Sequence, residues 1–381
     1  MRKIFVFCML CACGGAQVET EPKPASTEGT TVAVTAPTED AAAPVAQADA
    51  SVETAPDVLP PAKPTTIRLA SATGDAVDRE LDQGDAAFEK NDLDDAKRHY
   101  EAAKKLGPKR AGPAVGIARV RIAKSNAPLD YGASKGNAEV TAGVRDLRAA
   151  LALEKDFGPA HAELGRALLM LGDADGALAS LRRAVELLPN EAEAHSALGV
   201  ALLATGHKED ALGSLQRATT IDPGSAPRHG NLGTVMLLLG RVNDAVHEFE
   251  LQARLADGDA RAHSDLGTAL LAANQVPRAV TELERAVRID PQRASYLTNL
   301  GYAYQLSGRR ADAIAKYREA LKVDAKFASA WIDLATALAQ DAKTRGEARA
   351  ALLTAQRIDP TDPRVKANLE ELDAVEKAAK P

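Results

Sequence analysis

The chain has 381 residues, of which 3% are aromatic and 26% are charged, and its formal net charge at pH 7 is −6. So few large rings provide little area for one thick core, whereas helices that pack closely through small residues suit this composition. The acidic balance argues against phosphate contacts, so we expect no nucleic-acid partner. The cysteines are Cys8, Cys11 and Cys13, which excludes a disulfide framework or a cysteine-ligated zinc site in the rest of the chain.

The first residues have the pattern of an export signal. Residues 1–3 (Met-Arg-Lys) are positively charged and residues 4–9 form a compact apolar segment, as at the start of a secretory signal. Even when it is extended to Ala12, this apolar stretch is far shorter than the ~20 residues that span a bilayer. We therefore expect residues 1–12 to be a signal peptide.

Residues 10–14 read Leu-Cys-Ala-Cys-Gly, which resembles the bacterial lipobox. The resemblance implies cleavage before Cys13, a diacylglyceryl group on its thiol and acylation of its new amine. Several acyl chains, at ~0.8 kcal/mol per buried CH₂, would attach the chain to a membrane far more firmly than one chain. Gly14 after the cysteine implies an outer-membrane lipoprotein that faces the periplasm of a Gram-negative bacterium. The inner membrane and the cell surface remain alternatives, as does an ordinary signal cleaved near residues 14–16.

Residues 13–75 have the composition of a disordered linker. From Gly14 to Asp75 there is no aromatic residue, eight residues are proline, and nine acidic residues stand against three basic ones. Such a stretch cannot bury enough apolar surface to offset its chain entropy. At ~5–6 Å × √n, the linker reaches roughly 45 Å and would hold a folded module off a membrane. A spacer with no role beyond clearance is the alternative.

From residue 77 onward, a period of 34 residues dominates the sequence. A glycine, an alanine and a bulky apolar residue recur at fixed offsets: Gly165, Gly199, Gly233, Gly267 and Gly301; Ala177, Ala211, Ala245, Ala279 and Ala313; Leu181, Leu215, Phe249, Leu283 and Tyr317. Small residues at two fixed positions allow helix backbones to approach closely. Prolines such as Pro223 end the second helix of a unit. One helix pair cannot bury its own apolar stripe, so neighbouring pairs must stack.

This pattern resembles the tetratricopeptide repeat, a 34-residue unit of two antiparallel helices. The resemblance implies an all-α fold, a TPR α-solenoid in which helix-turn-helix repeats form a right-handed superhelix after a disordered N-terminal tether. The register predicts eight repeats in residues 76–361, with an insertion at residues 125–138 in repeat 2, and a capping helix at residues 362–381. A coincidental helical bundle is the alternative.

The sequence contains no phosphate-binding loop and no His-Glu-x-x-His or Gly-x-Ser-x-Gly motif, so we expect no catalytic residues, no cofactor and no enzymatic activity. An enzyme accessory of the glycosyltransferase type is the alternative. Four histidines also recur at the 34-residue period: His161, His195, His229 and His263. Equivalent positions in stacked pairs lie ~8–10 Å apart, too far to share a metal, so we expect packing at the position that Trp331 occupies. If the rings are buried and neutral, low pH would charge them and loosen the array.

The repeat resemblance also implies a concave surface lined by the first helix of each unit, two residues before and one residue after the fixed glycine. In the later units these residues are Asn231, Thr234, Asp265, Thr268, Asn299, Tyr302, Asp333 and Thr336. Each pair shares one helix face and could hydrogen-bond the backbone of an extended peptide. Glu163/Arg166 and Ala197/Val200 interrupt this series in the earlier units. A merely hydrated surface is the alternative.

We therefore interpret the chain as a non-enzymatic scaffold or assembly factor that binds a protein partner in its concave groove and a membrane through its lipid. The resemblances include lipoproteins of envelope machinery, such as pilus, secretin or motility complexes, and docking regulators of cell-wall enzymes. A purely structural spacer without a groove ligand is a third interpretation.

Overall fold

The computed structural model describes residues 66–71 and 73–378. Within these residues the chain forms seventeen α-helices and no strand, which confirms the predicted all-α fold. Sixteen helices form eight pairs, here called units 1 to 8: α1 (Ala76–Glu89) with α2 (Leu93–Leu106), α3 (Ala111–Lys124) with α4 (Ala138–Leu153), α5 (Gly158–Leu171) with α6 (Ala174–Leu187), α7 (Ala192–Ala204) with α8 (Lys208–Ile221), α9 (Ala226–Leu238) with α10 (Val242–Leu255), α11 (Ala260–Ala272) with α12 (Val276–Ile289), α13 (Ala294–Leu306) with α14 (Arg310–Val323), and α15 (Ala328–Ala339) with α16 (Arg345–Ile358). A 3-10 turn, η2 (Ala342–Thr344), joins the last pair, and α17 (Pro363–Ala378) follows it.

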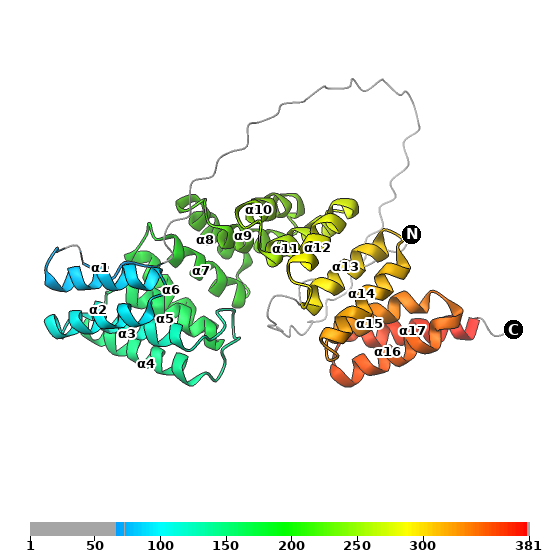
Figure 1. The fold of residues 1–381 in the computed structure, drawn as a ribbon, viewed down its shortest axis with the longest axis horizontal. Coiled ribbons are helices and arrows are strands. Elements are labelled where there is room, and N and C mark those ends of the chain that lie inside the picture. Colours follow the sequence, from blue (N-terminus) through cyan, green and yellow to red (C-terminus); the bar gives the residue numbers. More distant parts are fainter. Residues whose placement is uncertain (1–65, 72, 379–381) are drawn as a thin grey trace, which may run out of the picture.

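The units stack in chain order along an arch (Figure 1). Each helix packs against its pair partner, and the second helix of a unit packs against the first helix of the next. The odd-numbered helices also contact one another in sequence, from α1 to α17. The odd-numbered helices therefore form the inner layer of the arch, and stacking buries the apolar stripe that no pair could bury alone.

The fixed residues of the 34-residue period form the contact between the two helices of a unit. A Cβ atom at Gly165 would lie 2.4 Å from Cγ of Leu181, closer than any side chain tolerates. A Cβ atom added at Gly199 would likewise lie 2.4 Å from Cγ of Leu215. Ala177 and Leu181 are themselves fully buried. Small residues at these positions thus allow the close helix approach that the sequence predicted.

A short turn with left-handed backbone joins the two helices of most units. Gly172, Gly206 and Gly240 have φ values of 80°, 83° and 73°. Asn274 takes the same role with φ 58°. Glycine and asparagine are the residues that tolerate this conformation, so these four positions end the first helix of their units.

Residues 66–71, here called the strap, precede α1 and belong to the folded array. Ile67 and Leu69 are buried, with exposed fractions of 2% and 0%, whereas the side chain of Arg68 between them is exposed. This alternation is that of an extended chain with one face in the core. The prediction that the disordered linker continues to residue 75 is therefore wrong, because its last residues add apolar surface to the core.

The C-terminal helix α17 packs its apolar side on α15 and α16, where Val365 and Leu372 are buried. None of the described helices combines the length and the apolar character needed to cross a membrane. The predicted signal peptide at residues 1–12, the lipidation site Cys13 and the linker up to residue 65 lie outside the described residues.

Candidate functional site

The eight predicted groove residues all lie on the inner-layer helices α9, α11, α13 and α15. Seven are half-buried and Thr336 is exposed. The hydroxyl groups of Thr234, Thr268 and Thr336 donate to the carbonyl oxygen four residues earlier on their own helix, at 2.8–3.0 Å. These hydroxyl protons are therefore used within the helix, and only the oxygen atoms can accept a bond from a ligand.

The two asparagines of this set link neighbouring units. The side-chain amide of Asn231 donates to Oγ of Ser196 at 3.4 Å, and that of Asn299 donates to Oγ of Ser264 at 3.3 Å. Both bonds are long, and each amide has a second N–H and a carbonyl oxygen besides. Their role in binding a peptide stays a prediction.

The two aspartates of the set lie where burial favours the protonated form. Burial raises the pKa of Asp265 to about 6, although Arg261 opposes the shift. Burial raises the pKa of Asp333 to about 7, against the charge of Arg364. Around neutral pH, Asp333 is therefore partly protonated and can donate a hydrogen bond.

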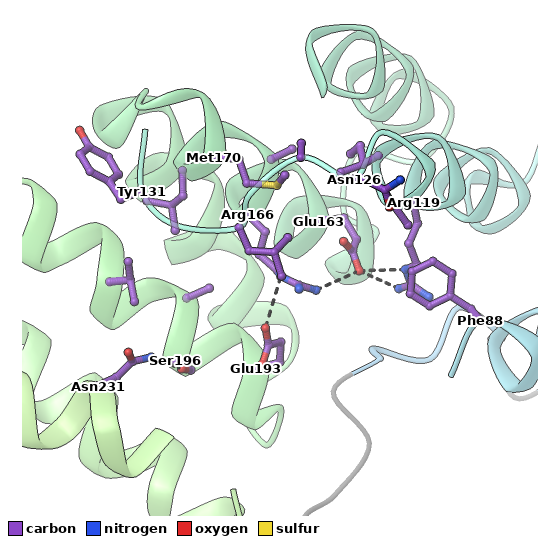
Figure 2. Close-up of a pocket in the computed structure, with 18 residues that line it drawn as sticks. Phe88, Arg119, Asn126, Tyr131, Glu163, Arg166, Met170, Glu193, Ser196 and Asn231 are labelled. Atoms are coloured by element: carbon purple, nitrogen blue, oxygen red, sulfur yellow. Dashed lines mark hydrogen bonds and ion pairs between the residues drawn. The ribbon is translucent and has the colours of Figure 1, made fainter. Parts of the chain in front are cut away.

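A cavity of about 600 Å³, here called the inner pocket, opens on the inner layer of units 2 to 4 (Figure 2). Its walls come mainly from α3, α5 and α7 and from residues 125–137, here called the insertion loop, which join α3 to α4. One residue each of α1 and α9 completes the lining. Leu129, Met170 and Val200 supply apolar surface, and Asn231 is the one predicted groove residue that lines it.

The insertion loop folds over the C-terminal end of α5. The backbone N–H groups of Gly132 and Ser134 donate to the carbonyl oxygens of Leu169 and Met170, each at 2.9 Å. The bond to Met170 satisfies a carbonyl group at the helix end, and the carbonyl oxygen of Leu169 also accepts from the N–H of Gly172. Leu129 is 72% exposed at the mouth of the pocket. Farther along the loop, Asp130 lies 3.5 Å from Arg261 of α11, so the loop reaches toward unit 6.

A row of five charged side chains, here called the charge ladder, crosses the inner layer from unit 1 to unit 4: Asp85, Arg119, Glu163, Arg166 and Glu193. Successive members lie 3.1, 2.9, 3.7 and 3.3 Å apart, and the signs alternate. Figure 2 shows the last four members along one side of the pocket. The first three are buried, so each depends on its neighbours for compensation.

Arg119 is the centre of the buried part of the ladder. Its guanidinium donates to Glu163 and Asp85 and lies 5.4 Å from the ring centroid of Phe88. Burial on its own would raise the pKa of Glu163, but the charge of Arg119 holds that pKa below its usual value. For Asp85, burial outweighs Arg119 and raises the pKa.

The strap binds to this buried part of the ladder through its backbone. The N–H of Leu69 donates to Oδ2 of Asp85, and the carbonyl oxygen of Ile67 accepts from Nη2 of Arg119, both at 2.8 Å. The side chain of Ile67 forms a buried cluster with Ala162, Ala184 and Ala194, which belong to α5, α6 and α7. The inner layer of units 1 to 4 thus holds an extended segment of its own chain.

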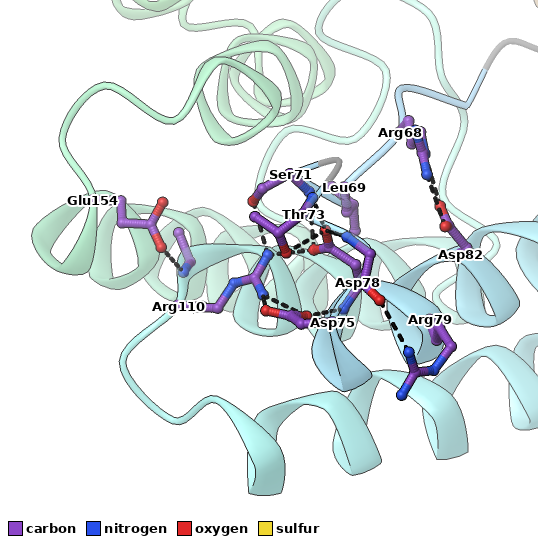
Figure 3. A network of polar contacts seen from close by, with 12 residues as sticks. Arg68, Leu69, Ser71, Thr73, Asp75, Asp78, Arg79, Asp82, Arg110 and Glu154 are labelled. Atoms are coloured by element: carbon purple, nitrogen blue, oxygen red, sulfur yellow. Dashed lines mark hydrogen bonds and ion pairs between the residues drawn. The ribbon is translucent and has the colours of Figure 1, made fainter.

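A second group of bonds fixes the turn from the strap into α1 (Figure 3). The buried carboxylate of Asp78 accepts from the backbone N–H groups of Ser71 and Thr73, at 3.0 and 2.6 Å. Burial on its own would raise the pKa of Asp78, but these bonds and the guanidinium of Arg110 hold it well below its usual value. At neutral pH the strap is therefore held by a charged carboxylate.

The recurring histidines serve the turns between units. In His161, His195, His229 and His263, Nε2 lies 2.8–3.0 Å from the carbonyl oxygen six residues earlier. Trp331 makes the same bond through Nε1 at 2.9 Å. These residues recur with the period because each one donates a ring N–H to the turn that joins two units. The described residues contain no group of side chains that could hold a metal ion.

The predicted loosening of the array at low pH is wrong for His229. Its Nδ1 lies 2.7 Å from Oε2 of Glu248, and its Nε2 faces the carbonyl oxygen of Pro223, so both ring nitrogens act as donors. Burial on its own would lower the pKa of His229, but these bonds raise it. His161 and His195 are only half-buried.

Sequence reasoning placed the groove in the later units and treated Glu163/Arg166 and Ala197/Val200 as interruptions. The inner pocket lies at these interruptions. The sequence does contain an indication of this pocket. In the third unit, charged residues, Glu163 and Arg166, occupy the two repeat positions that Asn231 and Thr234 occupy in the fifth unit.

The tetratricopeptide repeat family profile matches residues 136–192, 162–226 and 298–363. Within these residues the chain contains tetratricopeptide repeats. A second profile, described as a bacterial transcriptional activator domain, matches residues 236–326, which the structure builds from the same 34-residue units. Arrays of tetratricopeptide repeats are in general protein-binding scaffolds. No curated protein matches the chain.

Solved structures resemble the repeat array. The APC/C hetero-tetramer Cut9–Hcn1 aligns with a TM-score of 0.58 and 15% identity over 78% of this chain. The alignment spans 56% of that relative, and it shows the solenoid fold. MamA from Desulfovibrio magneticus RS-1 aligns with a TM-score of 0.41 and 20% identity over 45% of this chain and 96% of its own. YrrB, described as a TPR protein with an unusual peptide-binding site, aligns with a TM-score of 0.40 and 20% identity over 50% of this chain and 97% of its own.

Proposed function

We propose that this protein is a non-enzymatic scaffold that binds an extended segment of a partner protein in the inner pocket. The observation that carries the proposal is the strap, because the inner layer of the array already holds an extended segment by its backbone N–H and carbonyl groups. The inner pocket lies beside the strap on the same charge ladder. A second segment can therefore be held by the same kind of surface.

The lining of the inner pocket indicates the chemistry of the segment. Its charged residues are two arginines and two glutamates that pair with one another, and Glu193 also pairs with Arg228 behind the lining. The lining itself therefore carries no excess charge. Leu129, Met170 and Val200 offer apolar contacts, and Ser196 and Asn231 offer hydrogen bonds. An uncharged segment with an apolar side chain fits this lining best.

The proposal includes a membrane tether at Cys13. The lipobox-like residues 10–14 support a lipoprotein in the cell envelope, at the outer membrane and facing the periplasm. Such an anchor raises the local concentration of the array near envelope machinery, such as pilus, secretin or motility complexes. Palmitate labelling of cells tests this part, and we expect incorporation into the protein and none into Cys13→Ser. Incorporation that persists in Cys13→Ser contradicts the anchor.

Site-specific photo-crosslinking in cell envelopes tests the binding pocket. We expect a photoreactive residue at Val200 to form a protein adduct, because Val200 lines the pocket. A photoreactive residue at Leu353 of α16, which is 46% exposed away from the pocket lining, is the matched control. The adduct at Val200 should disappear when Ala197→Trp fills the pocket. The same adduct at both positions, or an adduct that Ala197→Trp does not affect, contradicts the proposal.

A further inference from the structure

The contact between strap and ladder defines a device for holding an extended backbone. Asp85 accepts the N–H of Leu69, and Arg119 donates to the carbonyl oxygen of Ile67, two residues earlier. In an extended chain, the carbonyl of one residue and the N–H of the residue two positions on point to the same side. An acid–arginine pair 3.1 Å apart therefore holds both groups at once. We call this pair the first clamp.

The charge ladder repeats this arrangement on the other side of Glu163. Oε1 of Glu163 lies 2.9 Å from Arg119 and 3.7 Å from Arg166. Each arginine then has an outer acid: Asp85 lies 3.1 Å from Arg119, and Glu193 lies 3.3 Å from Arg166. The ladder is thus two acid–arginine pairs that share one central glutamate.

The two pairs differ in what covers them. The strap covers the first clamp, where the side chains of Arg119 and Asp85 are 3% and 9% exposed. The side chains of Arg166 and Glu193 are 33% and 18% exposed, and both line the inner pocket. Ion pairing does not prevent backbone binding, because Asp85 also accepts from Tyr100 and Arg119 while it holds Leu69. Glu193 also pairs with Arg228 at 3.3 Å. A guanidinium has five N–H donors and a carboxylate about four acceptor sites, so the second pair still has spare capacity.

We propose that Arg166 and Glu193 form a second backbone clamp, which holds the partner segment in the inner pocket. This inference rests on the proposed function and names the contacts that would carry it. Arg166 donates to a carbonyl oxygen of the segment, and Glu193 accepts the N–H of the residue two positions later. The partner is bound through its main chain, so the clamp selects an extended conformation, and the apolar lining selects the side chains.

The order of charges also determines the direction of the bound segment. In the first clamp the acid belongs to α1 and the arginine to α3, and the strap runs from its carbonyl at Arg119 to its N–H at Asp85. In the second pair the arginine belongs to α5 and the acid to α7, which is the reverse order. The partner segment therefore runs from α5 toward α7, opposite to the strap.

The test uses peptides selected from a displayed library of random peptides on the full-length protein. One selected peptide is the probe, and its Kd is measured by fluorescence anisotropy. Each backbone amide of the probe is replaced in turn by an ester, which removes one N–H. We expect one replacement to weaken binding about tenfold on the unmodified protein. The same replacement should cost nothing further on Glu193→Met, whose side chain has no oxygen to accept the N–H. Glu282→Met, which removes the carboxylate that pairs with His263 outside the pocket, is the matched control and should retain the full ester effect.

Further readouts separate the clamp from the pocket. Ala197→Trp should abolish binding of the probe if the peptide occupies the inner pocket. Loss on Ala197→Trp without any ester effect overturns the clamp and leaves the proposed function standing. Failure to select any peptide, or binding that Ala197→Trp does not change, overturns both. A photo-crosslinker at the C-terminal end of the probe should label α7, and labelling of α3 from that end overturns the direction. The ester series on the unmodified protein keeps the test valid where Glu193→Met fails to fold.

Discussion

Units 1 to 4 and units 5 to 8 share one packing register but differ on the inner surface. In units 1 to 3 the inner positions carry charges that bind one another and the strap, as at Glu163 and Arg166, whereas unit 4 has Ala197 and Val200 there. In units 5 to 8 the same positions carry uncharged polar or partly protonated groups, as at Asn231 and Asp333. The helix contacts of Gly199 and Gly267 are nevertheless alike, because a Cβ added at either glycine would lie 2.4 or 2.5 Å from Cγ of the opposing leucine. The packing residues of the repeat therefore determine the solenoid fold, whereas the residues on the inner surface can differ in charge and polarity from unit to unit.

The largest expected difference between the two halves is at the buried charges. Arg119→Met should lower the free energy of unfolding by about 3–5 kcal/mol, because it removes the buried guanidinium that compensates the charges of Asp85 and Glu163. Arg278→Met is the control in the later units, where the ion pair with Glu250 is exposed and should contribute less than about 1 kcal/mol. Urea unfolding of both variants measures the contrast, and equal losses would show that the charge ladder carries no special stability.

The strap should be the next largest contribution. Ile67→Ala should cost about 2–4 kcal/mol, because it removes most of a fully buried side chain. Leu353→Ala removes a similar side chain that is 46% exposed, and its effect should stay within about 0.5 kcal/mol. Thermal unfolding compares the two variants. An Ile67→Ala protein as stable as the unmodified chain would place the strap outside the cooperative core.

The fixed glycines should behave alike in both halves. Gly199→Ala and Gly267→Ala should each cost about 1–3 kcal/mol, since the added Cβ meets Leu215 or Leu283. Gly213→Ala is the control, because its Cβ would meet nothing within 4 Å and a helix interior prefers alanine by ~1 kcal/mol. Urea unfolding should rank Gly213→Ala as neutral or stabilising. Clearly unequal losses at the two fixed glycines would contradict a shared packing register.

The smallest effect concerns pH and the histidines. The pKa of His229 is raised above its ordinary value of 6.5, so the stability from its bond to Glu248 is full below that value. This stability is lost as the pH rises through the raised pKa, by about 1 kcal/mol. Glu248→Gln should flatten this part of the pH profile of thermal unfolding. Ser180→Glu should create such a slope, because Ser180 holds the corresponding place beside His161, whose buried Nδ1 has no partner among the described residues. If thermal unfolding of both variants depended on pH as in the unmodified protein, the histidine–glutamate pair would not be a source of pH dependence.

The fold was predictable because its determinants recur locally. Gly165, Ala177 and Leu181 lie within one unit, and their spacing states which residues meet across a helix pair. The strap was not predictable in this way, because Ile67 and Leu69 are two apolar residues beside a proline-rich stretch and bind residues in distant units. The inner pocket escaped prediction because it depends on where the insertion loop goes. Nothing in the spacing around Leu129 indicates that the loop folds over the end of α5.

The strap determines where mechanical load would enter the array. A pull on the chain ahead of Thr66 meets Ile67 first, and Ile67 is clustered with residues of α5, α6 and α7. The bonds of Arg119 and Asp85 to the strap would then carry the force together, in shear. Tension would thus reach the third and fourth repeats through Ile67 and would reach α1 from its side through Asp85. A force on the chain ahead of the strap would therefore not unfold the array from the N-terminal end of α1.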